Sequence, residues 1–207
     1  RPLTNRRVEH AVVLVTNKNL EEIICTRTTA PFTYIRALLN AHVPTLLVEP
    51  FLSSGKGERK YGKFPDTFVP TDTMYRIQDI VTAATVLRSQ IPARTHLIGL
   101  SEAGMWCLFA GAMDDDIVSV LVDMDHFDTT DDAAWVERYY VPCIRNVGDV
   151  LTACALTAPR RLTLFNVSET FDRDTAQRFF TKNRIQILQK SPTVAQMVKF
   201  IKEASRD

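Results

Sequence analysis

Glycine is scarce in this sequence, and its scarcity excludes one large group of functions. Only seven glycines occur among 207 residues. None of them form a glycine-rich phosphate loop or a dinucleotide-binding fingerprint, the motifs in which the backbone approaches phosphate groups closely. We therefore expect no nucleotide chemistry and no cofactor.

Metal-binding patterns are also missing. The four cysteines show no C-x-x-C or Cys/His spacing, so we expect no structural zinc and interpret them as small buried hydrophobic residues. The acidic segment 123–132 has oxygen and imidazole ligands but lacks the D-x-D-x-D-G spacing of a calcium loop. A solvated loop with helix-capping aspartates is the favoured interpretation, and we predict no metal site.

No feature indicates a membrane or a nucleic acid as partner. No apolar run approaches the roughly 18 residues needed to span a bilayer, and the net charge of +1 favours no polyanionic surface. The opening RPLTNRRVEH holds no signal peptide, although a trimmed chain would look the same, so the compartment stays open.

The composition itself is that of an ordinary globular protein. Hydrophobic residues make up 45% of the chain and charged residues 24%. The length favours one domain over residues 1–207, either complete or as the C-terminal part of a longer chain.

Apolar runs alternate with helical patterns along nearly the whole chain. The runs are rich in valine, isoleucine and leucine, which is typical of strands buried on both faces of a parallel sheet; they lie at 11–16, 44–50, 95–100, 117–124, 161–167 and 184–189. Helical spacing is clearest at 71–90, after the cap candidates Thr71 and Asp72, and at 192–204, where Ser191 is the expected cap. The pattern predicts an α/β protein with a mainly parallel sheet in a three-layer α/β/α sandwich.

The segment Gly99-Leu-Ser-Glu-Ala-Gly104 lies between a predicted strand and a predicted helix. That is the setting of a nucleophile elbow, in which a strained turn exposes a serine hydroxyl. Gly99 and Ala103 supply the small residues that the close strand–helix approach needs. In the alternative interpretation, Ser101 only caps the following helix.

Residues around this serine carry a family resemblance. The runs RIQDIVTAATVLRSQ, HLIGLSEAGMWCLFAGA, FDTTDDAAW and LTAPRRLTLFNV resemble bacterial acetyl xylan esterase-like hydrolases of the α/β-hydrolase fold. The resemblance covers most of residues 11–204. It implies that the six strands are the third to eighth of that fold, and that its opening antiparallel strands are either missing or lie upstream of Arg1.

In this fold, the catalytic triad follows the chain order serine, acid, histidine. The acid is expected after the strand 161–167, where Asp172 is the first candidate and Glu169 the second; alternatively, Asp172 or Asp174 caps the next helix. A histidine is expected after the last strand, but none occurs beyond residue 126. The triad is therefore degenerate with respect to the family pattern.

Sheet polarity sorts the four histidines. His10, His42 and His96 lie at the amino ends of predicted strands, one strand length of ~17–20 Å from Ser101. A general base must lie within ~3 Å of the group that it deprotonates, so these three are excluded. His126 follows the neighbouring strand at its carboxyl end. An unusual triad of Ser101, His126 and Asp172 is the resulting catalytic hypothesis; otherwise His126 lines the cleft or pairs with a local carboxylate.

Two further roles can be assigned as predictions. The backbone N–H of Glu102 and the side chain of Asn17, in the loop after the first strand, are candidate oxyanion donors. Trp135 and Tyr139 are candidate sugar-stacking residues.

Two functions remain open from the sequence. The first is a serine esterase acting on small acyl esters, such as acetyl esters, with a small molecule or carbohydrate as the alcohol. The second is a catalytically degenerate hydrolase-fold domain that binds a ligand or partner protein, or supports an adjoining domain.

Overall fold

The protein is described by a computed structural model that covers residues 8–55, 69–181 and 184–204. The segment 51–70 is rich in glycine, proline, lysine and arginine, a composition that predicts a solvated loop or, alternatively, a substrate-binding one. Most of this segment lies outside the described residues. Among the described helices, none is long and apolar enough to cross a membrane.

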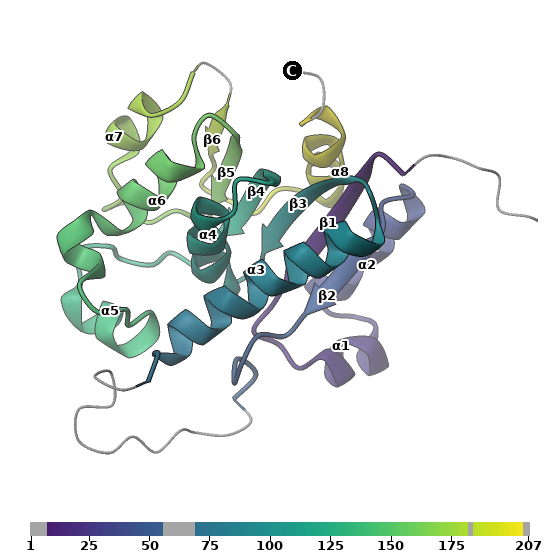
Figure 1. Cartoon of the computed structure of the whole chain (residues 1–207), viewed down its shortest axis with the longest axis horizontal. Coiled ribbons are helices and arrows are strands. Elements are labelled where there is room, and N and C mark those ends of the chain that lie inside the picture. Colours follow the sequence, from purple (N-terminus) through teal and green to yellow (C-terminus); the bar gives the residue numbers. More distant parts are fainter. Residues whose placement is uncertain (1–7, 56–68, 182–183, 205–207) are drawn as a thin grey trace, which may run out of the picture.

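One six-stranded sheet forms the centre of the molecule (Figure 1). Its spatial order is β2-β1-β3-β4-β5-β6, and every pairing is parallel. The strands are β1 (His10–Val15), β2 (Thr45–Val48), β3 (Arg94–Gly99), β4 (Ile117–Asp123), β5 (Arg161–Phe165) and β6 (Ile185–Ile187). All six predicted strands are confirmed.

Helices cover both faces, which confirms the three-layer α/β/α sandwich. On one face, α3 (Asp72–Gln90), α4 (Ala103–Met113) and α6 (Asp149–Thr157) share a core with the sheet, and Figure 1 shows α3 and α4 in front of it. On the other face, α2 (Ala30–Asn40) and α8 (Val194–Glu203) pack over a smaller core. The remaining helices are α1 (Leu20–Thr26), α5 (Asp132–Arg138), α7 (Arg173–Arg178) and the 3-10 turn η2 (Ile144–Val147).

Two helix caps show how local sequence sets the boundaries. The Thr71 hydroxyl accepts a hydrogen bond from the Met74 N–H, which confirms the predicted start of α3. The predicted cap of α8 is wrong by two residues. Thr193, not Ser191, caps that helix in a reciprocal capping box with Gln196, and Ser191 is thereby left for another contact.

The strand order positions the functional site. After β1 the chain moves outward to β2, and after β3 it moves the opposite way to β4. The loops that leave β1 and β3 therefore diverge at the carboxyl edge, and a crevice opens between them. Ser101 directly follows β3 at this switch point.

Candidate functional site

Ser101 lies in a sharp turn between β3 and α4. Its backbone adopts a left-handed conformation with φ +52°, a region that non-glycine residues rarely occupy and that marks functional turns. The side chain of Glu102, the N-cap residue of α4, makes no capping hydrogen bond, and Ser101 does not cap this helix. The alternative that Ser101 is a capping serine is therefore wrong, and the elbow geometry is confirmed.

The elbow depends on two glycines. A Cβ atom added at Gly99 would lie 2.7 Å from the Cα atom of Gly104, and one added at Gly104 would lie 1.8 Å from the carbonyl oxygen of Asp123. The sequence assigned the close approach to Gly99 and Ala103. Gly104 has the tighter contact, because α4 rests there directly on the end of β4.

Asp123 connects the ends of three strands. It ends β4, is only 9% exposed, and its carboxylate accepts three hydrogen bonds. The donors are the Ser101 N–H at 3.1 Å, the Asp125 N–H at 2.9 Å and the Asn166 side-chain amide at 2.8 Å. A buried carboxylate with several donors holds its surroundings in one arrangement, so Asp123 fixes the orientation of the elbow.

Strained backbone gathers along the same edge. Asp125, His126 and Asn166 have φ values of +48°, +51° and +52°. Together with Ser101, they follow the neighbouring strands β3, β4 and β5. Such conformations persist only where surrounding contacts stabilise them, and they are concentrated at functional sites.

Asn166 and Ser191 form a pair beside Ser101. The Asn166 amide nitrogen donates to the Ser191 hydroxyl at 3.1 Å. Asn166 directly follows β5, and Ser191 lies in the segment between β6 and α8. These are the places after the fifth and sixth strands where the triad order leads one to expect the acid and the histidine.

A pocket of about 380 Å³ opens above the elbow. Loop residues after β1, the start of α2 and the ends of β3 to β5 line it, including Thr16, Lys18, Tyr34, Ser101, Asp123 and Ser191. Tyr34 is half-buried there; burial raises the pKa of its phenol, and the nearby charge of Asp123 raises it further. The phenol therefore stays protonated and can donate a hydrogen bond into the pocket.

The predicted base lies on the expected edge but does not contact the serine. His126 follows β4, its side chain is exposed, and its backbone N–H donates to the Asn166 carbonyl at 2.8 Å. Within residues 8–55, 69–181 and 184–204, no hydrogen bond joins its imidazole to Ser101. The role of His126 as a base stays a prediction.

The predicted acid has a structural contact of its own. The Asp172 carboxylate accepts the Thr175 N–H at 2.9 Å and caps α7, which confirms the capping alternative. Hydrogen bonds from the hydroxyl and the N–H of Thr175 lower the pKa of this exposed carboxyl group. Glu169 is exposed in the loop before α7. The structure describes no hydrogen bond from either carboxylate to His126.

The two oxyanion candidates lie side by side. The Asn17 amide nitrogen is 3.4 Å from the Glu102 carboxylate and donates to it. Glu102 is the N-cap residue of α4 and directly follows the strained serine, so its backbone N–H belongs to the helix N-terminus beside Ser101. Their role as oxyanion donors stays a prediction.

Trp135 and Tyr139 are not available to a sugar. They are 3% and 0% exposed and pack on Phe127, with ring centroids 5.0 and 4.9 Å apart in edge-to-face geometry. The sequence interpretation of these rings as stacking residues is corrected, because α5 turns its aromatic face inward. The hydrophobic pattern could not distinguish an inward aromatic face from a cleft-lining one.

Three histidines lie away from this edge, as the strand polarity predicted. His10 begins β1, His96 lies near the start of β3, and His42 follows α2 before β2. The ring nitrogens of His10 and His96 are 3.0 Å apart, and His96 is 2.7 Å from the buried Ser119 hydroxyl. Their contacts are structural and belong to the amino ends of the strands.

The cysteines and acidic residues show no binding cluster. Cys107 and Cys154 are buried as expected, whereas Cys25 and Cys143 are exposed, and all four are free. In the described part of the chain, no group of three or more His, Cys, Asp or Glu side chains is arranged to hold a metal ion. Asp131 caps α5, as the favoured interpretation of segment 123–132 expects.

Solved structures similar to this chain share its fold at low identity. A CE15 glucuronoyl esterase from Teredinibacter turnerae T7901 matches with a TM-score of 0.63 and 15% identity, over 99% of this chain and 67% of that one. A cold-adapted esterase from an Arctic intertidal metagenomic library matches with a TM-score of 0.56 and 15% identity, over 97% and 84%. The α/β hydrolase GrgF from Penicillium sp. sh18 matches with a TM-score of 0.59 and 12% identity, over 95% and 89%.

No protein-family model matches the chain, and no curated protein does. The structural matches extend over nearly the whole chain, so the predicted α/β-hydrolase fold is confirmed. Sequence identities of 12–15% support a conclusion about the fold only.

Proposed function

We propose that this α/β-hydrolase-fold domain is catalytically degenerate and binds a small ester or a related carbonyl compound at Ser101. The observation that carries the proposal is the Asn166–Ser191 hydrogen bond of 3.1 Å, at the places where the acid and the histidine of a triad are expected. In this proposal, an amide lies where the acid that orients the imidazole is expected, and a hydroxyl lies where the general base is expected.

Neither side chain can fill the role of the triad group expected at its position. A general base needs a pKa near the working pH, so that it accepts and returns a proton. A carboxamide and an aliphatic alcohol do not titrate in that range. The pair can still hold the two loops together, because the second N–H of Asn166 donates to Asp123 at 2.8 Å. In this proposal, the edge keeps its structure, but Ser101 lacks a general base.

The remaining groups favour binding of a carbonyl compound. The Ser101 hydroxyl opens into the pocket of about 380 Å³, and the Glu102 N–H lies beside it. A carbonyl oxygen placed there would accept a hydrogen bond at the helix N-terminus. Lys18 and Tyr34 in the lining can donate to further oxygens of a small or carbohydrate ester.

A second candidate is an active serine esterase that cleaves small acyl esters, including acetyl groups on carbohydrate. The strained elbow favours it, since the φ of +52° at Ser101 serves no helix cap. His126 would take the Ser101 proton during attack on the ester carbonyl and return it to the departing alcohol. Asp172, or Glu169, would orient the imidazole, and the Glu102 N–H and Asn17 would bind the oxyanion.

In that mechanism, attack forms an acyl ester on Ser101, and water then cleaves it to release the acid. The imidazole would have to come within ~3 Å of the hydroxyl for both steps. Rearrangement of the loop after β4 would be required, because the His126 side chain is exposed.

Labelling with a fluorophosphonate probe separates the two candidates, because only an activated serine reacts. We expect no labelling of the wild type beyond that of Ser101→Ala. Labelling that disappears in both Ser101→Ala and His126→Ala would instead establish the esterase and overturn the degenerate site.

A gain of function tests the assigned positions directly. The double variant Asn166→Asp/Ser191→His places a carboxylate and an imidazole where the amide and the hydroxyl now lie. We expect it to gain probe labelling that is lost again on adding Ser101→Ala, while each single variant gains less. A correctly folded double variant without labelling would contradict the assignment of these two positions.

A further inference from the structure

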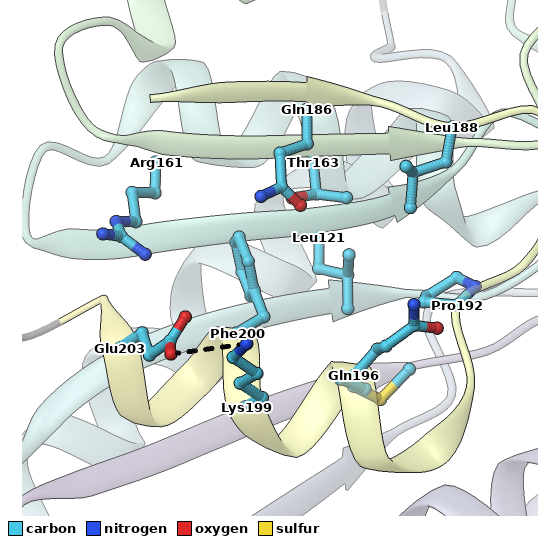
Figure 2. A pocket seen from close by; sticks show the side chains of 11 residues that line it. Leu121, Arg161, Thr163, Gln186, Leu188, Pro192, Gln196, Lys199, Phe200 and Glu203 are labelled. Carbon is cyan, nitrogen blue, oxygen red and sulfur yellow. Dashed lines mark ion pairs between the residues drawn. The ribbon is translucent and has the colours of Figure 1, made fainter. Parts of the chain in front are cut away.

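A second cleft lies between α8 and the sheet face formed by β4, β5 and β6 (Figure 2). It has a volume of about 210 Å³ and shares no lining residue with the pocket at Ser101. In Figure 2, Arg161 and Glu203 lie at one end of the cleft and Leu188 and Pro192 at the other. Its size restricts an occupant to a small molecule.

Thr163 is the buried polar group of this cleft. It lies in β5 on the face turned toward α8, is 2% exposed, and its hydroxyl has no hydrogen-bond partner among the described residues. Buried hydroxyl groups in proteins nearly always have a hydrogen-bond partner, because a buried hydroxyl without one destabilises the folded state. An acceptor atom from outside the chain is one way to satisfy it.

The polar groups around Thr163 are two cations and two side-chain amides, of which Gln186 lies next to Thr163 on β6 (Figure 2). Arg161 lies two residues earlier on the same face of β5, and Lys199 contributes a second cation from α8. The Gln196 side-chain oxygen accepts the Thr193 N–H at 2.7 Å within the capping box, so its amide nitrogen is left to donate. Among the described residues of the lining, Glu203 is the one carboxylate, and it pairs with Lys199 at 3.8 Å.

The base of the cleft is apolar. Leu121 of β4 and Phe200 of α8 face each other across it (Figure 2). Leu188 and Met197 add to the apolar lining. Leu121 is 1% exposed and Met197 likewise. A polar side with two cations, above an apolar base, favours a ligand that has an anionic group and an apolar part.

We propose that this cleft is a second binding site, for a small carboxylate with a compact apolar body. The carboxylate would accept hydrogen bonds from Arg161 and Thr163, and the apolar body would lie between Leu121 and Phe200. Guanidinium groups bind carboxylates through paired, charge-assisted hydrogen bonds. The site is independent of whether Ser101 is catalytic.

Benzoate is a suitable probe, with benzamide as its uncharged equivalent. Binding is measured by titration calorimetry and by chemical-shift changes in the isotope-labelled chain. We expect saturable benzoate binding and at least about tenfold weaker benzamide binding, since the charge-assisted contact to Arg161 is lost. Benzoate that fails to saturate, or that binds no better than benzamide, overturns the proposal.

Variants locate the binding. Arg161→Gln is expected to weaken benzoate about tenfold and Thr163→Val about threefold, whereas Arg178→Gln on the exposed side of α7 leaves it unchanged. Thermal unfolding confirms that each variant is folded. Ser101→Ala should leave the affinity unchanged; if it abolishes binding while Arg161→Gln does not, benzoate occupies the other pocket and this cleft is not the site.

Discussion

The backbone N–H of Ser101 donates a hydrogen bond of 3.1 Å to the carboxylate of Asp123. The strained residue at the end of β3 is thus held by a buried side chain at the end of β4. Asp123 also accepts hydrogen bonds from Asp125 and Asn166. The conformation of the elbow therefore depends on contacts from the ends of several strands and not only on the local sequence around Ser101.

Asp123→Asn should destabilise the protein. Asparagine keeps the shape of the side chain but offers a donor where the carboxylate accepts three hydrogen bonds, so at least one donor loses its partner. We expect a loss of about 1–3 kcal/mol in the free energy of unfolding, measured in urea. Asp174→Asn, at an exposed position of α7, is the control and should change little; equal stability of the two variants would show that Asp123 is not a structural centre.

Gly104→Ala tests the close contact of α4 with β4. The new Cβ atom would lie 1.8 Å from the Asp123 carbonyl oxygen, so the helix has to move. We expect a loss of about 3 kcal/mol or more in the free energy of unfolding. Gln177→Ala in α7 is a control on an exposed helix. A near-neutral Gly104→Ala would mean that helix and strand are farther apart than described.

Ser101→Gly and Ser101→Ala should differ in stability although both remove the hydroxyl. Glycine adopts the φ of +52° at this position without strain, whereas alanine does not. We expect the glycine variant to be more stable by about 1 kcal/mol in thermal or urea unfolding. Equal stabilities would argue against a left-handed conformation at residue 101.

We expect low pH to destabilise the protein, in part because His10 and His96, at the amino ends of β1 and β3, bind protons more readily in the unfolded chain. Burial lowers the pKa of His96 to about 3, and the pKa of His10 is lowered for the same reason. Below its ordinary pKa of 6.5, His96 takes up a proton in the unfolded chain but not in the folded one. Stability is therefore full above that pH and falls as the pH drops toward 3.

The loss between pH 7 and pH 5 should be about 2 kcal/mol from His96. Urea unfolding at several pH values measures it. His96→Gln should flatten the pH dependence in this range, while His42→Gln, at an exposed site outside the pair, should not. A slope that both variants leave unchanged would assign the acid sensitivity to carboxyl groups instead.

The sequence determined the layers of this protein. Continuous apolar runs form strands only where both faces are covered, so the six strands and the α/β/α arrangement followed from hydrophobic periodicity. Strand polarity then assigned Ser101 and His126 to one edge and His10 and His96 to the other. The elbow was recognisable because a serine between small residues followed a buried strand.

Tertiary structure alone decided which side chains meet at that edge. Asn166 and Ser191 are far apart in the chain, and their contact depends on the exact lengths of the loops after β5 and β6. Thr193 caps α8 two residues after the predicted cap, so Ser191 lies outside the helix and can contact Asn166. Trp135 and Tyr139 turned inward because the rotation of a short helix is set by its packing partners, which local sequence does not encode.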